Sequence, residues 1–245
     1  MCHSTDSRPP APPNPGEVAE HGPVNLTSAD GTEFLAYSAR PAEPRGAGLV
    51  ILPDIRGLHP YYADLTQRFA EAGFSAVAID YYGRTAGLGD RDDSFDWQQY
   101  LPQVRPDEVE ADVRAARAHL GSGPVFTVGF CFGGSQSWRL AASDADLAGV
   151  IGFYGKPSLV EDVVDQATKP MLLLVAGDDV ATPQTEFEAF AARLDEAGAT
   201  YEMHVYEGAP HSFFDRSYGE WESACADAWS RILAFTGKAK TTTSA

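Results

Sequence analysis

Cysteine is scarce in this sequence of 245 residues, which contains only Cys2, Cys131 and Cys225. Three cysteines cannot build a disulfide framework and their spacings fit no zinc site, so the sequence predicts a protein of the reducing cytoplasm. Long apolar runs are missing as well. No stretch approaches the about 20 apolar residues that span a membrane, and residues 1–23 contain no apolar segment of the kind found in secretory signals.

Positive charge is also in short supply. The 18 Lys and Arg residues face 35 Asp and Glu residues, which gives a formal net charge of -17. A field of this sign repels polyanions, so the composition argues against nucleic acids and anionic membrane surfaces as partners. No cluster of side chains has metal-ligand spacing, and we expect neither a metal nor another cofactor.

Two tails flank one predicted domain over residues 24–236. Residues 1–23 contain the run Pro-Pro-Ala-Pro-Pro and, like residues 237–245, are predicted to be disordered. Apolar runs predict strands over 24–27, 33–38, 48–52, 75–79, 125–129, 147–153, 171–175 and 201–205. Helical periodicity predicts helices over 60–72, 107–120, 133–142, 185–197 and 221–235. This alternation predicts an α/β fold, a mostly parallel sheet with helices on both faces. The polar segment 83–104 is expected to form a loop or short helix over a site.

The segment 127–134 is the most informative part of the sequence. It reads Thr-Val-Gly-Phe-Cys-Phe-Gly-Gly, a strand that ends in a tight turn and opens a helix, with Cys131 at the apex. The pattern G-x-Nuc-x-G is that of a nucleophile elbow, here with cysteine where most esterases carry serine. The flanking glycines leave room for a strained turn, and a helix N-terminus favours a thiolate and, later, an oxyanion.

A base and an acid follow this cysteine in the chain. A free thiol has a pKa of about 8.5 and needs a base, and the base needs a third group that fixes its tautomer. In α/β-hydrolases the order is nucleophile, acid, histidine, each after a strand. Here Asp178 and Asp179 follow the strand predicted over 171–175, and His211 follows the strand predicted over 201–205.

Each of these residues has an ordinary alternative. Cys131 would serve equally as a small buried hydrophobe, either aspartate as a helix cap, and His211 as a surface loop residue. Their joint occurrence at the right strand ends, in the right order, favours chemistry over coincidence. His59 also follows a strand, but it precedes the nucleophile in the chain.

With these residues in place, the chain resembles the dienelactone hydrolase family of α/β-hydrolases over Val24–Phe235. The elbow, the spacing from Asp179 to Pro183 and the run from Pro210 to Phe213 carry the resemblance, together with residues 52–58 and 70–84. It implies an α/β-hydrolase fold, a monomer, and a cysteine-dependent hydrolase of a small-molecule carboxylic ester or lactone, similar to carboxymethylenebutenolidase.

The family resemblance also implies roles for individual residues. Cys131 would attack the carbonyl carbon, and His211, oriented by Asp179, would act as the base. Asp179 is preferred to Asp178 as the acid because of its spacing to Pro183. The backbone N–H groups of Ile55 and Phe132 would hold the oxyanion, and water would then hydrolyse the thioester.

Further positions are assigned by the same resemblance. Asp54 stands where the family usually has a glutamate that binds the resting cysteine and helps to activate it, so Asp54 is expected to reach Cys131 directly or through water. Arg84 matches one arginine that binds a substrate carboxylate. Arg216 is a looser match for the second, because the expected register falls on Asp215. The alternative is that these arginines pair with nearby aspartates.

Aromatic side chains are the expected apolar wall of the site. Tyr82, Trp97 and Phe213 are the candidates, with the protein core as the alternative place for each.

Other functions fit the sequence less well. A general carboxylesterase with a different substrate would keep the triad. A glutamine amidotransferase also has a G-x-C-x-G elbow, but Gln136 is one residue out of register and His211 lacks the following glutamate. A redox-sensing or non-catalytic α/β protein with Cys131 as a reactive thiol would require the triad to be incidental.

Overall fold

An eight-stranded sheet forms the centre of the molecule, with the strand order β1-β2-β4-β3-β5-β6-β7-β8. The computed structural model describes residues 7–238, apart from the side chains of residues 216–218. The strands are β1 (Val18–Thr27), β2 (Glu33–Pro41), β3 (Gly48–Leu52), β4 (Ser75–Ile79), β5 (Val125–Phe130), β6 (Gly149–Phe153), β7 (Met171–Asp178) and β8 (Tyr201–Pro210). Pairing is antiparallel from β1 to β4 through β2 and parallel from β4 to β8. The predicted α/β fold class is confirmed.

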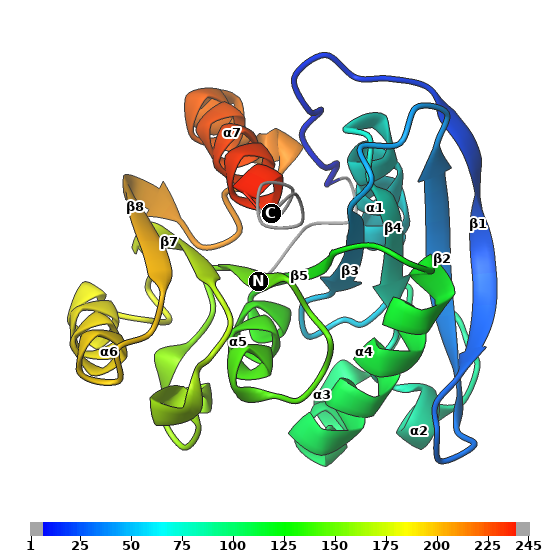
Figure 1. Ribbon diagram of the computed structural model, residues 1–245, viewed down its shortest axis with the longest axis horizontal. Coiled ribbons are helices and arrows are strands. Elements are labelled where there is room, and N and C mark those ends of the chain that lie inside the picture. The colour runs from blue at the N-terminus through cyan, green and yellow to red at the C-terminus, as the bar shows by residue number, and fades with distance from the viewer. Residues whose placement is uncertain (1–6, 239–245) are drawn as a thin grey trace, which may run out of the picture.

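Helices cover both faces of this sheet (Figure 1). The α-helices are α1 (Pro60–Glu71), α2 (Gly83–Ala86), α3 (Trp97–Tyr100), α4 (Pro106–Leu120), α5 (Phe132–Arg139), α6 (Gln184–Glu196) and α7 (Glu222–Lys238). Short 3-10 turns lie at η1 (Leu101–Gln103), η2 (Leu140–Ala142), η3 (Pro157–Leu159), η4 (Val164–Gln166) and η5 (Arg216–Trp221). The helix expected over 133–142 is therefore α5 followed by the 3-10 turn η2.

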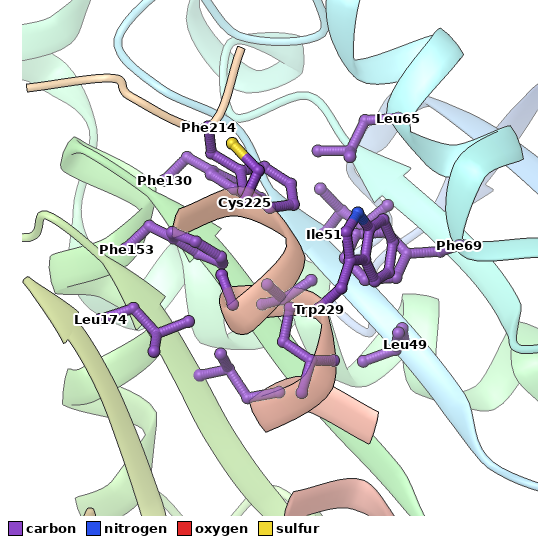
Figure 2. Close-up of a cluster of buried hydrophobic side chains, with 14 of the residues drawn as sticks. Leu49, Ile51, Leu65, Phe69, Phe130, Phe153, Leu174, Phe214, Cys225 and Trp229 are labelled. Carbon is purple, nitrogen blue, oxygen red and sulfur yellow. The ribbon is translucent and has the colours of Figure 1, made fainter. Parts of the chain in front are cut away.

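Two apolar clusters lie on opposite faces of the sheet. On one face α1 and α7 pack together, with Phe69 and Trp229 at a ring separation of 4.9 Å (Figure 2). On the other face α4, α5 and α6 supply Val113, Trp138 and Phe190. Alternate residues of the strands feed the two clusters, because neighbouring side chains of a strand point to opposite faces. Because the parallel strands β3 to β8 are packed on both faces, their carboxyl ends lie together at one edge of the sheet.

The N-terminal segment differs from its prediction. Strand β1 begins at Val18, and Pro9, Pro10 and Pro12 are buried, so the prediction of a disordered tail is wrong for residues 7–23. The N–H of Gly16 donates to the Glu71 carbonyl at the end of α1, at 2.8 Å. Prolines suit such an extended, packed segment because their φ is already fixed. The N-terminal part of the predicted tail, residues 1–6, lies outside the described residues, as do residues 239–245.

Candidate active site

Cys131 occupies a strained turn between β5 and α5. Its φ of 55° and ψ of -118° are unusual for a residue with a side chain, a conformation that costs on the order of 1–3 kcal/mol and is typical of functional sites. The Cys131 N–H donates to the Phe153 carbonyl of β6, at 3.1 Å. The turn therefore presents a half-buried thiol at the carboxyl end of the sheet.

Glycines beside the cysteine make this turn possible. A Cβ atom on Gly129 would lie 1.9 Å from the carbonyl oxygen of Gly133, and one on Gly133 would lie 2.1 Å from the carbonyl oxygen of Leu52. Both distances are far below contact and both neighbours are backbone atoms, so neither position accepts a side chain. The close approach of Gly133 also brings the loop after β3 against the start of α5.

The acid and the base meet because β7 and β8 pair to their last residues. Asp178 pairs with Pro210 after an irregularity in the register, so Asp179 and His211 follow directly at neighbouring strand ends. The Nδ1 atom of His211 lies 2.6 Å from Oδ2 of Asp179. The Asp179 side chain is fully buried, and its Oδ1 accepts the Ala181 N–H at 2.8 Å, whereas Asp178 is exposed.

This pair fixes the histidine for base chemistry. With Asp179 ionised, the Nδ1–H of His211 donates to it, and Nε2 is then the basic nitrogen. The ring of Tyr154 packs against the imidazole, with 4.9 Å between ring centroids. Tyr154 has a φ of 35° and directly follows β6. Sequence reasoning missed it, although its place after an apolar strand was the available signal.

The loop after β3 is tied to the elbow on both sides. Tyr62 packs on Phe130, just before the cysteine, and its hydroxyl accepts the N–H of Asp54 at 2.9 Å. Tyr81 packs on Phe132, just after the cysteine, and its hydroxyl donates to the Pro53 carbonyl at 2.5 Å. Residues 53–58, here named the β3 loop, therefore lie beside the first turn of α5.

The two backbone N–H groups expected to bind the oxyanion belong to α5 and to the β3 loop. Phe132 is the first residue of α5, and the first N–H groups of a helix have no acceptor within the helix. The Gly57 N–H donates to the Asp54 carbonyl at 3.1 Å, which orients the peptide that carries the Ile55 N–H. The Ile55 carbonyl accepts the Tyr82 hydroxyl.

Asp54 is fully buried and forms an ion pair with Arg56. The Arg56 Nη2 lies 2.9 Å from Asp54 Oδ2, and the Arg56 N–H donates to Oδ1 at 2.8 Å. The Arg56 Nε also donates to Oδ1 at 3.1 Å, so the guanidinium contacts both carboxylate oxygens, a geometrically specific two-point contact. The side chain of Arg56, only 12% exposed, brings a cation to the β3 loop that sequence reasoning missed.

Comparison with known proteins identifies the family. The family model described as "Dienelactone hydrolase family" matches residues 34–239. The chain belongs to the dienelactone hydrolase family. A Salmonella typhi protein named for carboxymethylenebutenolidase activity is 29% identical over 231 residues, covering 86% of this chain and 84% of that protein. A Bradyrhizobium protein named for 2-oxo-3-(5-oxofuran-2-ylidene)propanoate lactonase activity is 29% identical and covers 84% of this chain and 90% of its own length.

Solved structures agree with this assignment. A Klebsiella pneumoniae crystal structure described as a dienelactone hydrolase has a TM-score of 0.74 and 29% identity, and it covers 88% of this chain and 98% of its own. A Pyrococcus furiosus esterase shares the fold at a TM-score of 0.65 and 13% identity, covering 93% of this chain and 96% of its own. The predicted family is confirmed.

Arg84 does not have the setting expected of a carboxylate-binding arginine in this family. Its guanidinium pairs with Asp30 and Asp112 and donates to the Thr32 hydroxyl. These partners belong to the turn between β1 and β2 and to α4. Arg84 therefore forms ion pairs with aspartates other than those near it in sequence, and its role in substrate binding stays a prediction.

The second expected arginine cannot be placed, because the side chain of Arg216 lies outside the described part of the structure. The register position of the family arginine is Asp215, which is buried. One of its carboxylate oxygens lies 3.4 Å from the backbone N–H of Arg8. An acid therefore stands where the resemblance calls for a cation.

The three aromatic residues expected to form the apolar wall of the site lie in different places. Phe213 is buried and packs on Tyr206, at 4.8 Å between ring centroids, so it belongs to the core. Tyr82 is buried too, but its hydroxyl reaches the β3 loop. Trp97 begins α3 and is half-buried.

No group of three or more His, Cys, Asp or Glu residues within the described part of the chain is arranged to hold a metal ion. Among the same residues, no helix is both long and apolar enough to cross a membrane.

Proposed function

We propose that this protein hydrolyses a small-molecule carboxylic ester or lactone with Cys131 as nucleophile, His211 as base and Asp179 as the acid that orients it. The observation that carries the proposal is the 2.6 Å bond between His211 and Asp179, at the same edge of the sheet as the strained Cys131 turn. Three side chains from three strand ends then perform the roles that a hydrolytic triad requires. The family relationship supports the same reaction class.

The first half-reaction forms a thioester. His211 Nε2 accepts the proton of Cys131, and the thiolate sulfur bonds to the carbonyl carbon. The resulting oxyanion accepts hydrogen bonds from the Phe132 and Ile55 N–H groups. When the tetrahedral intermediate collapses, the carbon–oxygen bond to the leaving group breaks. The imidazolium of His211 then protonates the departing oxygen, which in a lactone stays on the same molecule.

The second half-reaction uses water. His211 removes a proton from the water molecule, whose oxygen bonds to the thioester carbon. Collapse of the second intermediate breaks the carbon–sulfur bond, releases the acid and returns Cys131 as a thiol. Asp179 stays ionised and stabilises the imidazolium in both steps.

A general carboxylesterase is the second candidate, and the placement of Arg84 favours it over a specialised dienelactone hydrolase. Arg84 is neutralised by two carboxylates, and the buried Asp215 takes the place of the second arginine. A substrate without a carboxylate needs neither cation. Measuring kcat/KM for dienelactone beside a neutral p-nitrophenyl ester separates the two candidates. Preference for the lactone would favour the specialised enzyme.

The triad is tested with Cys131→Ala and His211→Ala, assayed against both substrates. Each variant is expected to lose at least about 1,000-fold in kcat/KM. Cys225→Ala is the matched control, because burial raises the pKa of the Cys225 thiol to about 12 and keeps it protonated. Mass spectrometry of an acid-quenched reaction should show the acyl group on Cys131. Full turnover by folded Cys131→Ala would overturn the proposal.

A further inference from the structure

A buried ion pair joins two segments near the candidate site. Arg91 lies in residues 87–104, here named the cover segment, and its Nη2 is 2.9 Å from Oδ2 of Asp80 at the end of β4. The two side chains are 2% and 0% exposed. Burying two charges is expensive unless they are paired, and an ion pair of this kind is often weak in net stability. Because such a pair adds little net stability, its role is better explained by the two segments that it holds together.

The first connection runs from Asp80 to the β3 loop. The Leu58 N–H points to Asp80 Oδ1 at 3.4 Å, and a Cβ on Gly57 would lie 2.6 Å from the same oxygen. Gly57 has a φ of +72° and donates its N–H to the Asp54 carbonyl. That carbonyl shares a peptide plane with the Ile55 N–H. The position of Asp80 thus sets the turn that orients this N–H.

The second connection runs through aromatic rings. The Arg91 guanidinium lies over Phe95, 4.6 Å from the ring centroid. Phe95 stacks on Tyr100 at 5.4 Å and packs on Tyr82 at 5.0 Å. The Tyr82 hydroxyl then donates to the Ile55 carbonyl. The cover segment therefore contacts the β3 loop through two routes that both start at Arg91.

A third contact supports the same arrangement. His59, directly after the β3 loop, lies with Nε2 3.2 Å from Oδ1 of Asp93 in the cover segment. Its Nδ1 accepts the Tyr61 N–H and caps α1. The cover segment is thus attached to both sides of the loop, at Tyr82 and at His59.

We infer that Arg91 is a positioning residue for the hydrolysis: through Asp80 and Phe95 it fixes the β3 loop so that the Ile55 N–H is aimed at the oxyanion. The inference rests on the proposed function. Oxyanion donors contribute only when they are held in place before the charge develops, and the loss of one donor costs about 100- to 1,000-fold in kcat. Arg91 touches neither the thiol nor the imidazole, so its effect is confined to the donor.

Two variants test this positioning. Arg91→Met removes the cation and keeps much of the side-chain volume, but it leaves Asp80 buried and unpaired. Tyr82→Phe removes only the hydroxyl that bonds the Ile55 carbonyl, so it tests the second route in a variant expected to fold. Arg117→Met on α4 is the control, because Arg117 pairs with Asp146 at the surface and has no part in the site. Arg91→Lys tests rescue by a residue that keeps the charge.

Two readouts distinguish positioning from general damage. One is kcat and KM for a neutral p-nitrophenyl ester. The other is the rate at which iodoacetamide alkylates Cys131, a displacement at a saturated carbon that forms no oxyanion. We expect Arg91→Met and Tyr82→Phe to lower kcat about 10-fold or more with KM within about twofold. Alkylation should stay within about twofold of wild type, and Arg91→Lys should recover part of kcat.

Three results would overturn the inference. Unchanged kcat in both folded variants would show that the cover segment does not position the loop. A parallel loss of alkylation and hydrolysis would place the damage at the thiol and imidazole instead. If the wild-type protein hydrolysed no ester or lactone while Cys131 still reacted with iodoacetamide, the proposed function itself would fail, and the inference with it.

Discussion

The imidazole of His211 and the carboxylate of Asp179 form a 2.6 Å contact between Nδ1 and Oδ2, and it joins the residues that directly follow two neighbouring parallel strands. Such a contact determines which nitrogen of the ring is basic. The contact also gives the two adjacent aspartates, Asp178 and Asp179, different environments. Asp179 turns inward to the histidine, whereas Asp178 remains exposed as the last residue of β7.

Asp179→Asn is therefore expected to lower kcat/KM for an ester substrate by about 1,000- to 10,000-fold. The amide supports the wrong tautomer of His211 and cannot stabilise the imidazolium. Steady-state hydrolysis of a p-nitrophenyl ester measures the loss. The neighbouring variant Asp178→Asn, made at an exposed position, should retain full activity. A large loss in Asp178→Asn with activity kept in Asp179→Asn would reverse the assignment.

The elbow glycines predict a folding defect rather than a catalytic one. Gly129→Ala would place a methyl group 1.9 Å from the Gly133 carbonyl oxygen, so the turn must open or the chain must fail to fold. We expect a fall in unfolding free energy of more than about 4 kcal/mol, at the extreme of single substitutions. Denaturant unfolding measures it. Gly22→Ala on β1, where an added Cβ meets no atom within 4 Å, should change stability little.

Arg84→Met should reduce stability without changing substrate preference. The side chain is 9% exposed and pairs with Asp112, whose pKa is raised by burial, so its removal leaves a buried carboxylate uncompensated. Breaking such a pair costs about 3–5 kcal/mol. A second substitution, Asp112→Asn, should restore part of this loss in denaturant unfolding. The ratio of kcat/KM for a carboxylate-bearing ester to that for a neutral ester should be unchanged. A selective loss on the charged ester would return Arg84 to the substrate site.

Much of this arrangement could be predicted from sequence because local patterns determine it. Periodicity located the strands, and the turn after β5 follows from two glycines around Cys131. The order of acid and histidine identified the residues that meet at the ends of β7 and β8.

Long-range pairing could not be predicted in the same way. Whether Arg84 faces a substrate or two aspartates depends on α4 and the first hairpin, both far away in sequence. The pairing of Asp54 with Arg56 is local, but the short spacing alone does not show that the two side chains turn toward each other. The N-terminal prolines were misread because composition alone does not show that a surface exists for them to pack on.

The buried pair of Asp80 and Arg91 predicts a specific pH dependence of stability. Burial raises the pKa of Asp80 from 3.8 to about 6, despite the opposing effect of Arg91. The folded state therefore holds this proton more tightly than the unfolded state does. Stability from this group is fully present below about pH 4 and is lost as pH rises through about 6. A shift of about two pKa units corresponds to about 3 kcal/mol.

Asp80→Asn removes this titration, so the wild type should lose stability relative to the variant by about 3 kcal/mol between pH 4 and pH 7. Urea unfolding at several pH values measures the difference. Asn, like the protonated carboxyl, carries no charge, so the variant should be closest to the wild type in stability near pH 4 and should gain on it as the pH rises. Replacing both residues, as Asp80→Asn with Arg91→Met, should cost less than the two single losses added together. Strict additivity would show that the two charges do not interact in the folded protein. A stability difference that does not change with pH would show instead that burial does not raise the pKa of Asp80.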